Sequence, residues 1–91
     1  MKNISAKNIH VTGNVQGVFF RAHAKELADQ LGIKGFVENR EDGSVFIHAE
    51  GNEDALNELE EWCHHGPPDA KVESVRAKDV IEIGMELFEI R

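Results

Sequence analysis

The segment from Gly13 to Arg21, with the sequence GNVQGVFFR, has the composition of a binding site for an oxyanion. Gly13 and Gly17 permit backbone angles and close backbone approaches that other residues resist. Successive amide N–H groups can therefore point at one centre, and a helix that follows the segment adds the positive end of its dipole. The segment predicts a site for phosphate.

Arg21 would lie in the first turn of the helix that follows. A cation is unfavourable at that end of a helix, and an anion bound close by would remove the conflict. In the alternative interpretation the glycines form an ordinary strand-to-helix turn and Arg21 is a solvated surface charge, since short glycine motifs are common. The residue types and their spacing leave both interpretations open.

Hydrophobic spacing predicts the elements on either side of this segment. Residues 8–12 alternate like a half-buried strand, with Ile9 and Val11 on one face. Beyond the segment, apolar residues recur at helical spacing until Gly32, a suitable helix C-terminus. The helical stripe consists of Phe20, Ala24, Leu27, Ala28 and Leu31. A strand therefore enters the glycine segment and a helix leaves it.

The middle of the chain predicts a hairpin and a second helix. Residues 35–40 and 44–50 have the character of strands, and the Asp-Gly pair at 42–43 supplies the backbone angles of a tight antiparallel hairpin. Asn52 is the expected N-cap of a helix that ends at the Gly-Pro-Pro of residues 66–68. The buried stripe of this helix consists of Leu56, Leu59 and Cys63.

The last part of the chain completes a recognisable order of elements. Residues 72–78 predict a fourth strand and residues 85–90 a short final one, whereas the pattern assigns no structure to residues 80–84. The order βαββαβ, with room for a short fifth strand, is that of an α+β ferredoxin-like sandwich, in which two helices cover one face of an antiparallel sheet. We expect a single domain over residues 1–91, because a chain of this length has room for one core. The fold hosts many functions, so the function must be argued from the loops.

Composition limits the classes of partner. The formal net charge of −7 argues against nucleic acid, whose binding depends on clustered Lys and Arg. Cys63 is the only cysteine, which excludes an internal disulfide and a multi-cysteine metal cluster. No apolar run approaches the roughly 18 residues of a membrane span, and the N-terminus lacks the apolar stretch of a signal peptide. We expect a cytoplasmic protein that binds no membrane and acts as a monomer.

Three segments together resemble a known enzyme family. GNVQGVFFR at residues 13–21 matches every fixed position of the acylphosphatase signature G-x-V-Q-G-V-x-F-R. Residues 35–45, GFVENREDGSV, resemble the family segment G-[WF]-V-x-N-x-x-D-G-x-V, and the Gly-Pro-Pro of residues 66–68 recurs in the family. The resemblance extends over residues 9–90 and implies an acylphosphatase that works without metal or cofactor and forms no covalent intermediate.

The resemblance also implies a role for particular residues. The implied phosphate-binding residues, largely through their backbone amides, are Val15, Gln16, Gly17, Val18, Phe19, Phe20 and Arg21. The implied catalytic residues are Arg21, which holds the phosphate, and Asn39, which positions the attacking water. The family position after the first glycine is often basic and here is Asn14, which would weaken the attraction of the substrate without touching the catalytic positions.

This chemistry suits the substrate that the resemblance implies, a small-molecule acyl phosphate. Its leaving group is a carboxylate, so an enzyme can work by positioning water and stabilising charge on the phosphoryl oxygens. Asn39 offers an acceptor and a donor that can hold a water in line, but it is too weak a base to deprotonate it, so we expect the substrate phosphate to take the proton. A turn role for Asn39 is the alternative, although it lies three residues before Asp42, which is early for that role.

The histidines predict no metal site. His10 and His48 alternate with apolar neighbours on expected strands, and their separation matches no zinc pattern. His64 and His65 fall in the last turn of the second helix, where they favour the helix dipole. His23 is closest to the glycine segment, but we do not expect it to act in catalysis.

Three other functions fit parts of these observations. A non-catalytic ferredoxin-like module that binds or senses a phosphorylated metabolite would keep the anion cradle, but it would have no need of both Arg21 and Asn39. A domain of a larger protein is a second alternative, because hydrogenase maturation carbamoyltransferases begin with an acylphosphatase-like domain; we expect the chain from Met1 onward to be complete. An RNA-recognition module shares the order of strands but requires basic, aromatic-rich strands that the sequence lacks.

Overall fold

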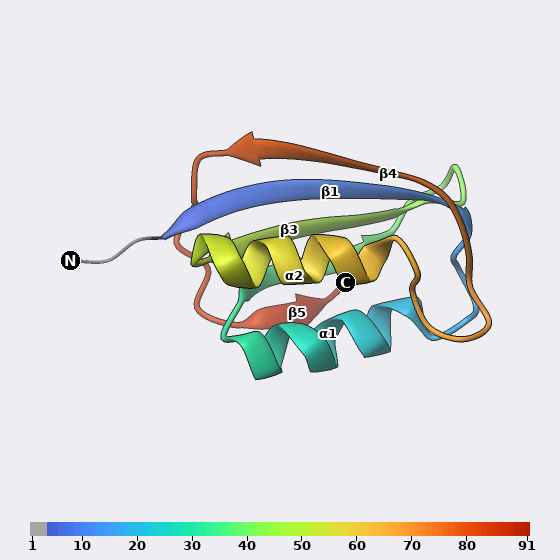
Figure 1. The fold of residues 1–91 in the computed structure, drawn as a ribbon, viewed down its shortest axis with the longest axis horizontal. Coiled ribbons are helices and arrows are strands. Elements are labelled where there is room, and N and C mark those ends of the chain that lie inside the picture. The colour runs from blue at the N-terminus through green and yellow to red at the C-terminus, as the bar shows by residue number, and fades with distance from the viewer. Residues whose placement is uncertain (1–3) are drawn as a thin grey trace.

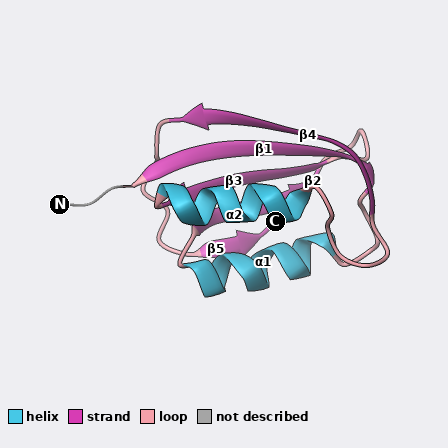
Figure 2. Ribbon diagram, viewed as in Figure 1, coloured by secondary structure: helices cyan, strands magenta, loops and turns pink. Residues whose placement is uncertain are grey.

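The computed structural model describes residues 4–91 and contains two helices packed on a five-stranded sheet. Figure 1 shows both helices on the same face of the sheet, and Figure 2 separates helices, strands and loops by colour. Along the chain the elements are β1 (Ser5–Asn14), α1 (Phe20–Leu31), β2 (Lys34–Asn39), β3 (Val45–Gly51), α2 (Glu53–Cys63), β4 (Lys71–Val80) and β5 (Phe88–Ile90). No helix within residues 4–91 is long and apolar enough to cross a membrane.

The strand order across the sheet is β4-β1-β3-β2-β5, which confirms the predicted ferredoxin-like arrangement with a short fifth strand. All neighbouring pairs are antiparallel except β2 and β5, which run parallel. The expectation of a wholly antiparallel sheet was therefore wrong at one edge. The chain leaves β4 at the end of the sheet where β2 begins, and β5 must then run in the same direction as β2.

The hydrophobic core lies between the sheet and the helices. Ile9 and Val11 of β1 are fully buried, as the alternating pattern predicted, and they face buried residues of both helices. The rings of Phe20 in α1 and Trp62 in α2 lie 5.0 Å apart between their centroids, which packs the beginning of one helix against the end of the other. The core therefore fixes the start of α1, where the phosphate site was predicted.

Several element boundaries differ from those that the pattern predicted. β1 and β4 extend beyond residues 8–12 and 72–78, because their antiparallel pairing continues past the half-buried stretch, with a register shift between Thr12 and Gly13. β5 covers only part of residues 85–90. Helix α2 ends at Cys63, so the two histidines predicted in its last turn follow it.

The hairpin between β2 and β3 has a longer loop than a two-residue turn. The Arg40 N–H donates to the Ser44 carbonyl oxygen at 2.9 Å, and the Ser44 N–H donates to Asp42 Oδ1 at 2.9 Å. Gly43 has a φ of +91°, which is the positive angle that the Asp-Gly pair predicted. The loop holds Asn39, the last residue of β2, at the edge of the site described below.

Replacing Asn52 by alanine is expected to lower the free energy of unfolding by about 1 kcal/mol. Asn52 is the N-cap of α2, and its Oδ1 accepts a hydrogen bond of 2.8 Å from the Ala55 N–H, which no other group of the helix can satisfy. Urea unfolding of the two proteins measures the difference. Glu58→Ala, at an exposed position of the same helix, is the control and should change stability by less than about 0.5 kcal/mol; an equal loss in both variants would contradict the capping role.

Candidate active site

The positive end of the α1 dipole is not neutralised by any residue of its first turn. Phe19 occupies the N-cap in a left-handed conformation, with φ 65° and ψ 24°, and its side chain makes no capping hydrogen bond. The first turn contains no acidic residue. A non-glycine residue in this conformation carries strain that is typical of functional sites. The helix therefore presents its free N–H groups and its dipole to whatever lies in front of them.

The backbone amides of the loop before α1 have no partner in the protein. Within residues 4–91, no backbone or side-chain acceptor receives a hydrogen bond from the N–H groups of residues 16–20. Gly17 has a φ of +75° and open space around its missing Cβ, so the angle and not the space requires glycine there. Consecutive amides that have no acceptor in the protein and point at one centre can form a cradle for an anion.

Gln16 and Val15 attach this loop to the rest of the fold. The Gln16 Nε2 donates hydrogen bonds to the Arg40 carbonyl oxygen at 2.7 Å and to the Ser44 carbonyl oxygen at 2.8 Å. The side chain of Val15 is 1% exposed and belongs to the core. The Gln16 side chain thus joins the phosphate loop to the β2–β3 hairpin. Its place in the motif was recognised from the sequence, but this structural use of its side chain was not.

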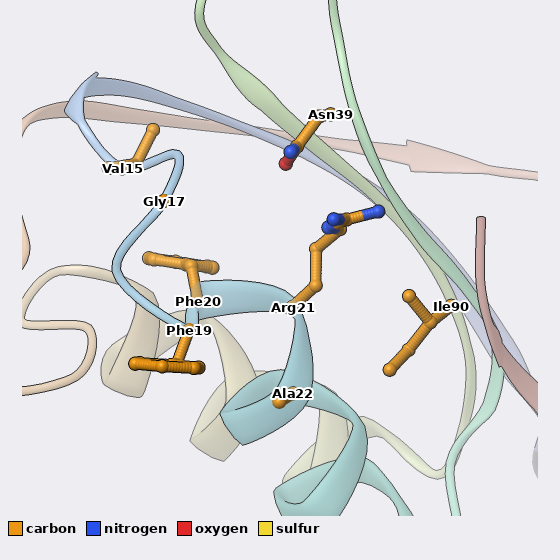
Figure 3. Close-up of a pocket in the computed structure, with 8 residues that line it drawn as sticks. All are labelled: Val15, Gly17, Phe19, Phe20, Arg21, Ala22, Asn39 and Ile90. Carbon is orange, nitrogen blue, oxygen red and sulfur yellow. The ribbon is translucent and has the colours of Figure 1, made fainter.

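A cavity of about 300 Å³ lies in front of the loop and the helix (Figure 3). Its lining residues are Val15, Gly17, Phe19, Phe20, Arg21, Ala22, Asn39 and Ile90. The structure therefore brings together both predicted catalytic residues and four of the other predicted phosphate-binding residues. The remaining two, Gln16 and Val18, do not line the cavity, although their amides belong to the same loop.

Among residues 4–91, Arg21 alone contributes a charged side chain to the lining of the cavity. In Figure 3 its guanidinium group points toward the side chain of Asn39, across the space between α1 and β2. No Asp or Glu side chain of the described residues lines this cavity, so the guanidinium and the helix N-terminus supply positive potential there in a chain whose net charge is −7. An anion bound between the guanidinium and the helix N-terminus would offset the unfavourable interaction of Arg21 with the helix dipole.

The guanidinium of Arg21 is held by the residue that follows β5, the edge strand next to β2. Its Nη1 donates a hydrogen bond of 2.8 Å to the main-chain oxygen of Arg91, and the Arg91 N–H donates to the Val37 carbonyl oxygen at 2.8 Å. Ile90 of β5 lines the cavity beside it. Sequence reasoning missed both Ile90 and Arg91, since no motif marks them and only the pairing of β5 with β2 places them here.

Asn39 has an exposed side chain that makes no hydrogen bond to any part of the chain that the structure describes. It ends β2, opposite Val45 of β3. Its amide oxygen and nitrogen are therefore both available to a ligand or a water in the cavity. The role of a turn residue does not apply, because Asn39 belongs to the strand and the turn hydrogen bonds are made by Arg40, Asp42 and Ser44.

The histidines lie outside the cavity. His23 Nδ1 is 2.9 Å from the Phe19 carbonyl oxygen, and His10 Nε2 is 2.8 Å from Ser44 Oγ. In residues 4–91 no three His, Cys, Asp or Glu side chains are grouped so that they could hold a metal ion. The groups that can act on a substrate in this cavity are the amides, the guanidinium of Arg21 and the carboxamide of Asn39.

Comparison with known proteins gives one consistent result. The family model described as Acylphosphatase matches residues 7–90. An acylphosphatase from a Nocardioides species is 45% identical over 87 residues, which cover 96% of this chain and 88% of that protein. The structure of an acylphosphatase from Coxiella burnetii has a TM-score of 0.94 at 35% identity, with 98% of this chain and 94% of that chain covered. The acylphosphatase from Bacillus subtilis has a TM-score of 0.93 at 38% identity, with 96% and 98% covered.

Proposed function

Since the chain belongs to the acylphosphatase family, we propose that Arg21 and Asn39 are the catalytic residues with which it hydrolyses acyl phosphates. The protein is an acylphosphatase, a hydrolase that converts an acyl phosphate to a carboxylate and inorganic phosphate. The observation that supports the assignment best is that Arg21 and Asn39 meet at one cavity with Gly17, Phe19 and Phe20, loop residues whose amides have no acceptor within residues 4–91.

The loop and Arg21 bind the phosphoryl group in this proposal. Its oxygens accept hydrogen bonds from the amides of residues 16–20, and the guanidinium adds a charged, forked donor that matches phosphate geometry. These donors are fixed before the substrate arrives, by Gln16 on one side and by the main-chain oxygen of Arg91 on the other. Charge that develops on the equatorial oxygens is stabilised without reorganisation of the protein.

Asn39 positions the nucleophile. Its carboxamide accepts a hydrogen bond from a water and orients that water for in-line attack on phosphorus. The bond from phosphorus to the acyl oxygen breaks as the new bond forms, and the carboxylate leaves without needing a proton. Asn39 is too weak a base to remove the proton from water, so the proton passes to an oxygen of the phosphoryl group.

Other properties of the enzyme follow as proposals from the chemistry and the charge. The reaction needs no metal or cofactor in this scheme, because the amides and Arg21 supply the positive potential. The net charge of −7 favours a small-molecule substrate over a nucleic acid. We also propose a single domain that acts as a monomer in the cytoplasm; the shared core of the helices and the sheet supports the single domain.

Titration of the ¹⁵N-labelled protein with inorganic phosphate tests the assignment of the loop. The amide resonances of residues 16–20 are expected to move together with a single dissociation constant, because one bound anion contacts them all. The same constant should appear as competitive inhibition of benzoyl phosphate hydrolysis measured with a chelator present. Phosphate inhibition that leaves these five resonances unmoved would place the phosphate site elsewhere, and loss of turnover in the chelator would contradict metal independence.

A further inference from the structure

The segment between β4 and β5 is fastened to one buried carboxylate. Residues 81–87 carry the chain from one edge of the sheet to the other, at the end opposite the phosphate loop (Figure 1). Glu50, near the end of β3, is 3% exposed and accepts hydrogen bonds from this segment. The donors are the backbone amides of Ile83 at 2.7 Å, Gly84 at 3.2 Å and Met85 at 3.0 Å.

Two further side chains hold Glu50 in place. Its Oε2 is 2.6 Å from Nε2 of His48, and Nδ1 of the same imidazole is 2.7 Å from Asn8 Oδ1. The chain of contacts crosses from β1 to β3 on the sheet face away from the helices, since Ile47 and Ala49 on the other face belong to the core. On one side Glu50 is thus fixed by the sheet. On the other side it holds residues 81–87, which are called the crossing segment below.

The protein keeps this carboxylate ionised in spite of its burial. Burial alone would raise the pKa of Glu50, but the Ile83 amide, the His48 side chain and the Met85 amide together hold the pKa below its ordinary value. A buried carboxylate is costly unless such donors satisfy it. The backbone amides of the crossing segment therefore satisfy the buried carboxylate of Glu50.

The crossing segment leads directly into β5, and the residue that follows β5 contacts Arg21. The Leu87 carbonyl oxygen accepts a hydrogen bond of 2.8 Å from the Gly35 N–H as β5 begins. Three residues of β5 follow, and then the main-chain oxygen of Arg91 accepts a hydrogen bond of 2.8 Å from the Arg21 guanidinium. A strand this short has few ladder hydrogen bonds of its own, so its position depends on what holds its two ends.

We propose that Glu50 is a positioning residue for the phosphate site, which fixes the crossing segment and, through β5, the main-chain oxygen of Arg91 that orients Arg21. This inference rests on the proposed role of Arg21 as the phosphate-binding group. Glu50 does not touch the substrate and acts from the opposite end of the sheet. Phe88, which is 3% exposed, and Lys25, whose Nζ donates to the Phe88 carbonyl oxygen at 3.0 Å, also anchor β5. The loss of Glu50 should therefore loosen Arg21 without releasing the strand completely.

Glu50→Ala is expected to raise the inhibition constant of inorganic phosphate by about 3- to 10-fold. Arg21 would lose its fixed acceptor and would have to be ordered when the anion binds, which costs roughly one hydrogen bond and the freedom of one long side chain. The amides of residues 83–85 should also exchange with deuterium faster than in the wild type. Glu50→Gln keeps one carbonyl acceptor and should fall between the two proteins in both measurements.

Leu59→Ala is the control for a purely structural effect. Leu59 is fully buried in α2, and its truncation should lower the melting temperature without changing the inhibition constant of phosphate, measured well below the transition. If Glu50→Ala does not fold, Glu50→Gln carries the test with the same measurements. An unchanged inhibition constant in a folded Glu50 variant whose 83–85 amides exchange faster would overturn the proposal.

A double-mutant cycle decides whether Glu50 acts through Arg21. Adding Glu50→Ala to Arg21→Ala should cause no further loss of phosphate affinity, because the group that Glu50 positions is already absent. A further loss of the same 3- to 10-fold would show that Glu50 acts by another route and would overturn the inference. If Arg21→Ala alone left phosphate affinity intact, the assignment of Arg21 would be the one to fail, and the two failures are thus distinguishable.

Discussion

Arg21→Ala is expected to lower the turnover of benzoyl phosphate by about 10²- to 10³-fold, the usual loss when one preorganised donor to a developing negative charge is removed. In the part of the chain that the structure describes, Arg21 alone contributes a charged side chain to the lining of the cavity, so no neighbouring side chain there can substitute for it. The affinity for inorganic phosphate should fall as well, because in the proposed role the guanidinium would contact the anion in the ground state and in the transition state. The kcat and the inhibition constant of phosphate measure the two effects separately.

Arg76→Ala is the matched control for the change in charge. Arg76 is an exposed residue of β4 and does not line the cavity, so its loss should leave both constants near their wild-type values. Near-normal turnover by a folded Arg21→Ala protein would refute the assignment of Arg21. A similar loss in both variants would indicate that overall charge, and not the placement of Arg21, attracts the substrate.

Asn39→Ala is expected to reduce kcat by about 10²-fold and to leave the affinity for inorganic phosphate nearly unchanged. A nucleophile misplaced by about 1 Å can cost this much, and the carboxamide is the group that would orient the water. The proposed phosphate contacts come from the loop and Arg21, which the substitution does not remove. This separation of kcat from phosphate affinity distinguishes Asn39 from Arg21.

Asn57→Ala provides the comparison for Asn39. Asn57 is exposed on α2 and does not line the cavity, and within residues 4–91 its side chain makes one hydrogen bond, accepted from Lys7 Nζ at 3.2 Å. It should retain full kcat and phosphate affinity. If Asn39→Ala instead lost phosphate affinity and kept its kcat, Asn39 would be a phosphate ligand and the water would have to be positioned by another group.

The parts of the fold that depend on local spacing could be predicted from the sequence. The alternation around Ile9 and Val11, the helical stripe from Phe20 and the capping residue Asn52 each describe an element by its own residues, and the structure has those elements. The loop before α1 could be singled out for the same reason, since its glycines and Arg21 lie within nine residues of the chain, and its binding of phosphate stays a prediction. Local chemistry is sufficient where the interacting groups are neighbours in sequence.

The features that sequence reasoning missed depend on contacts between distant segments. Ile90 and Arg91 enter the site only because β5 pairs with β2, and a three-residue strand carries too little pattern to predict its partner or its direction. Glu50 was expected to be an ordinary strand residue, and it is buried because residues 81–87 cross over it. Residues 80–84 had no pattern that could have indicated this contact.

The placement of Arg21 and Arg91 has a consequence for the synthesis of the enzyme on the ribosome. The loop before α1 emerges from the ribosome well before Arg91, the residue that orients Arg21, which is made about seventy positions later. β1 lies between β3 and β4 in the sheet, so it also waits for partners that are made after it. A nascent chain can therefore carry the complete signature motif and still have no working site, and hydrolysis should begin only after residue 91 has left the exit tunnel.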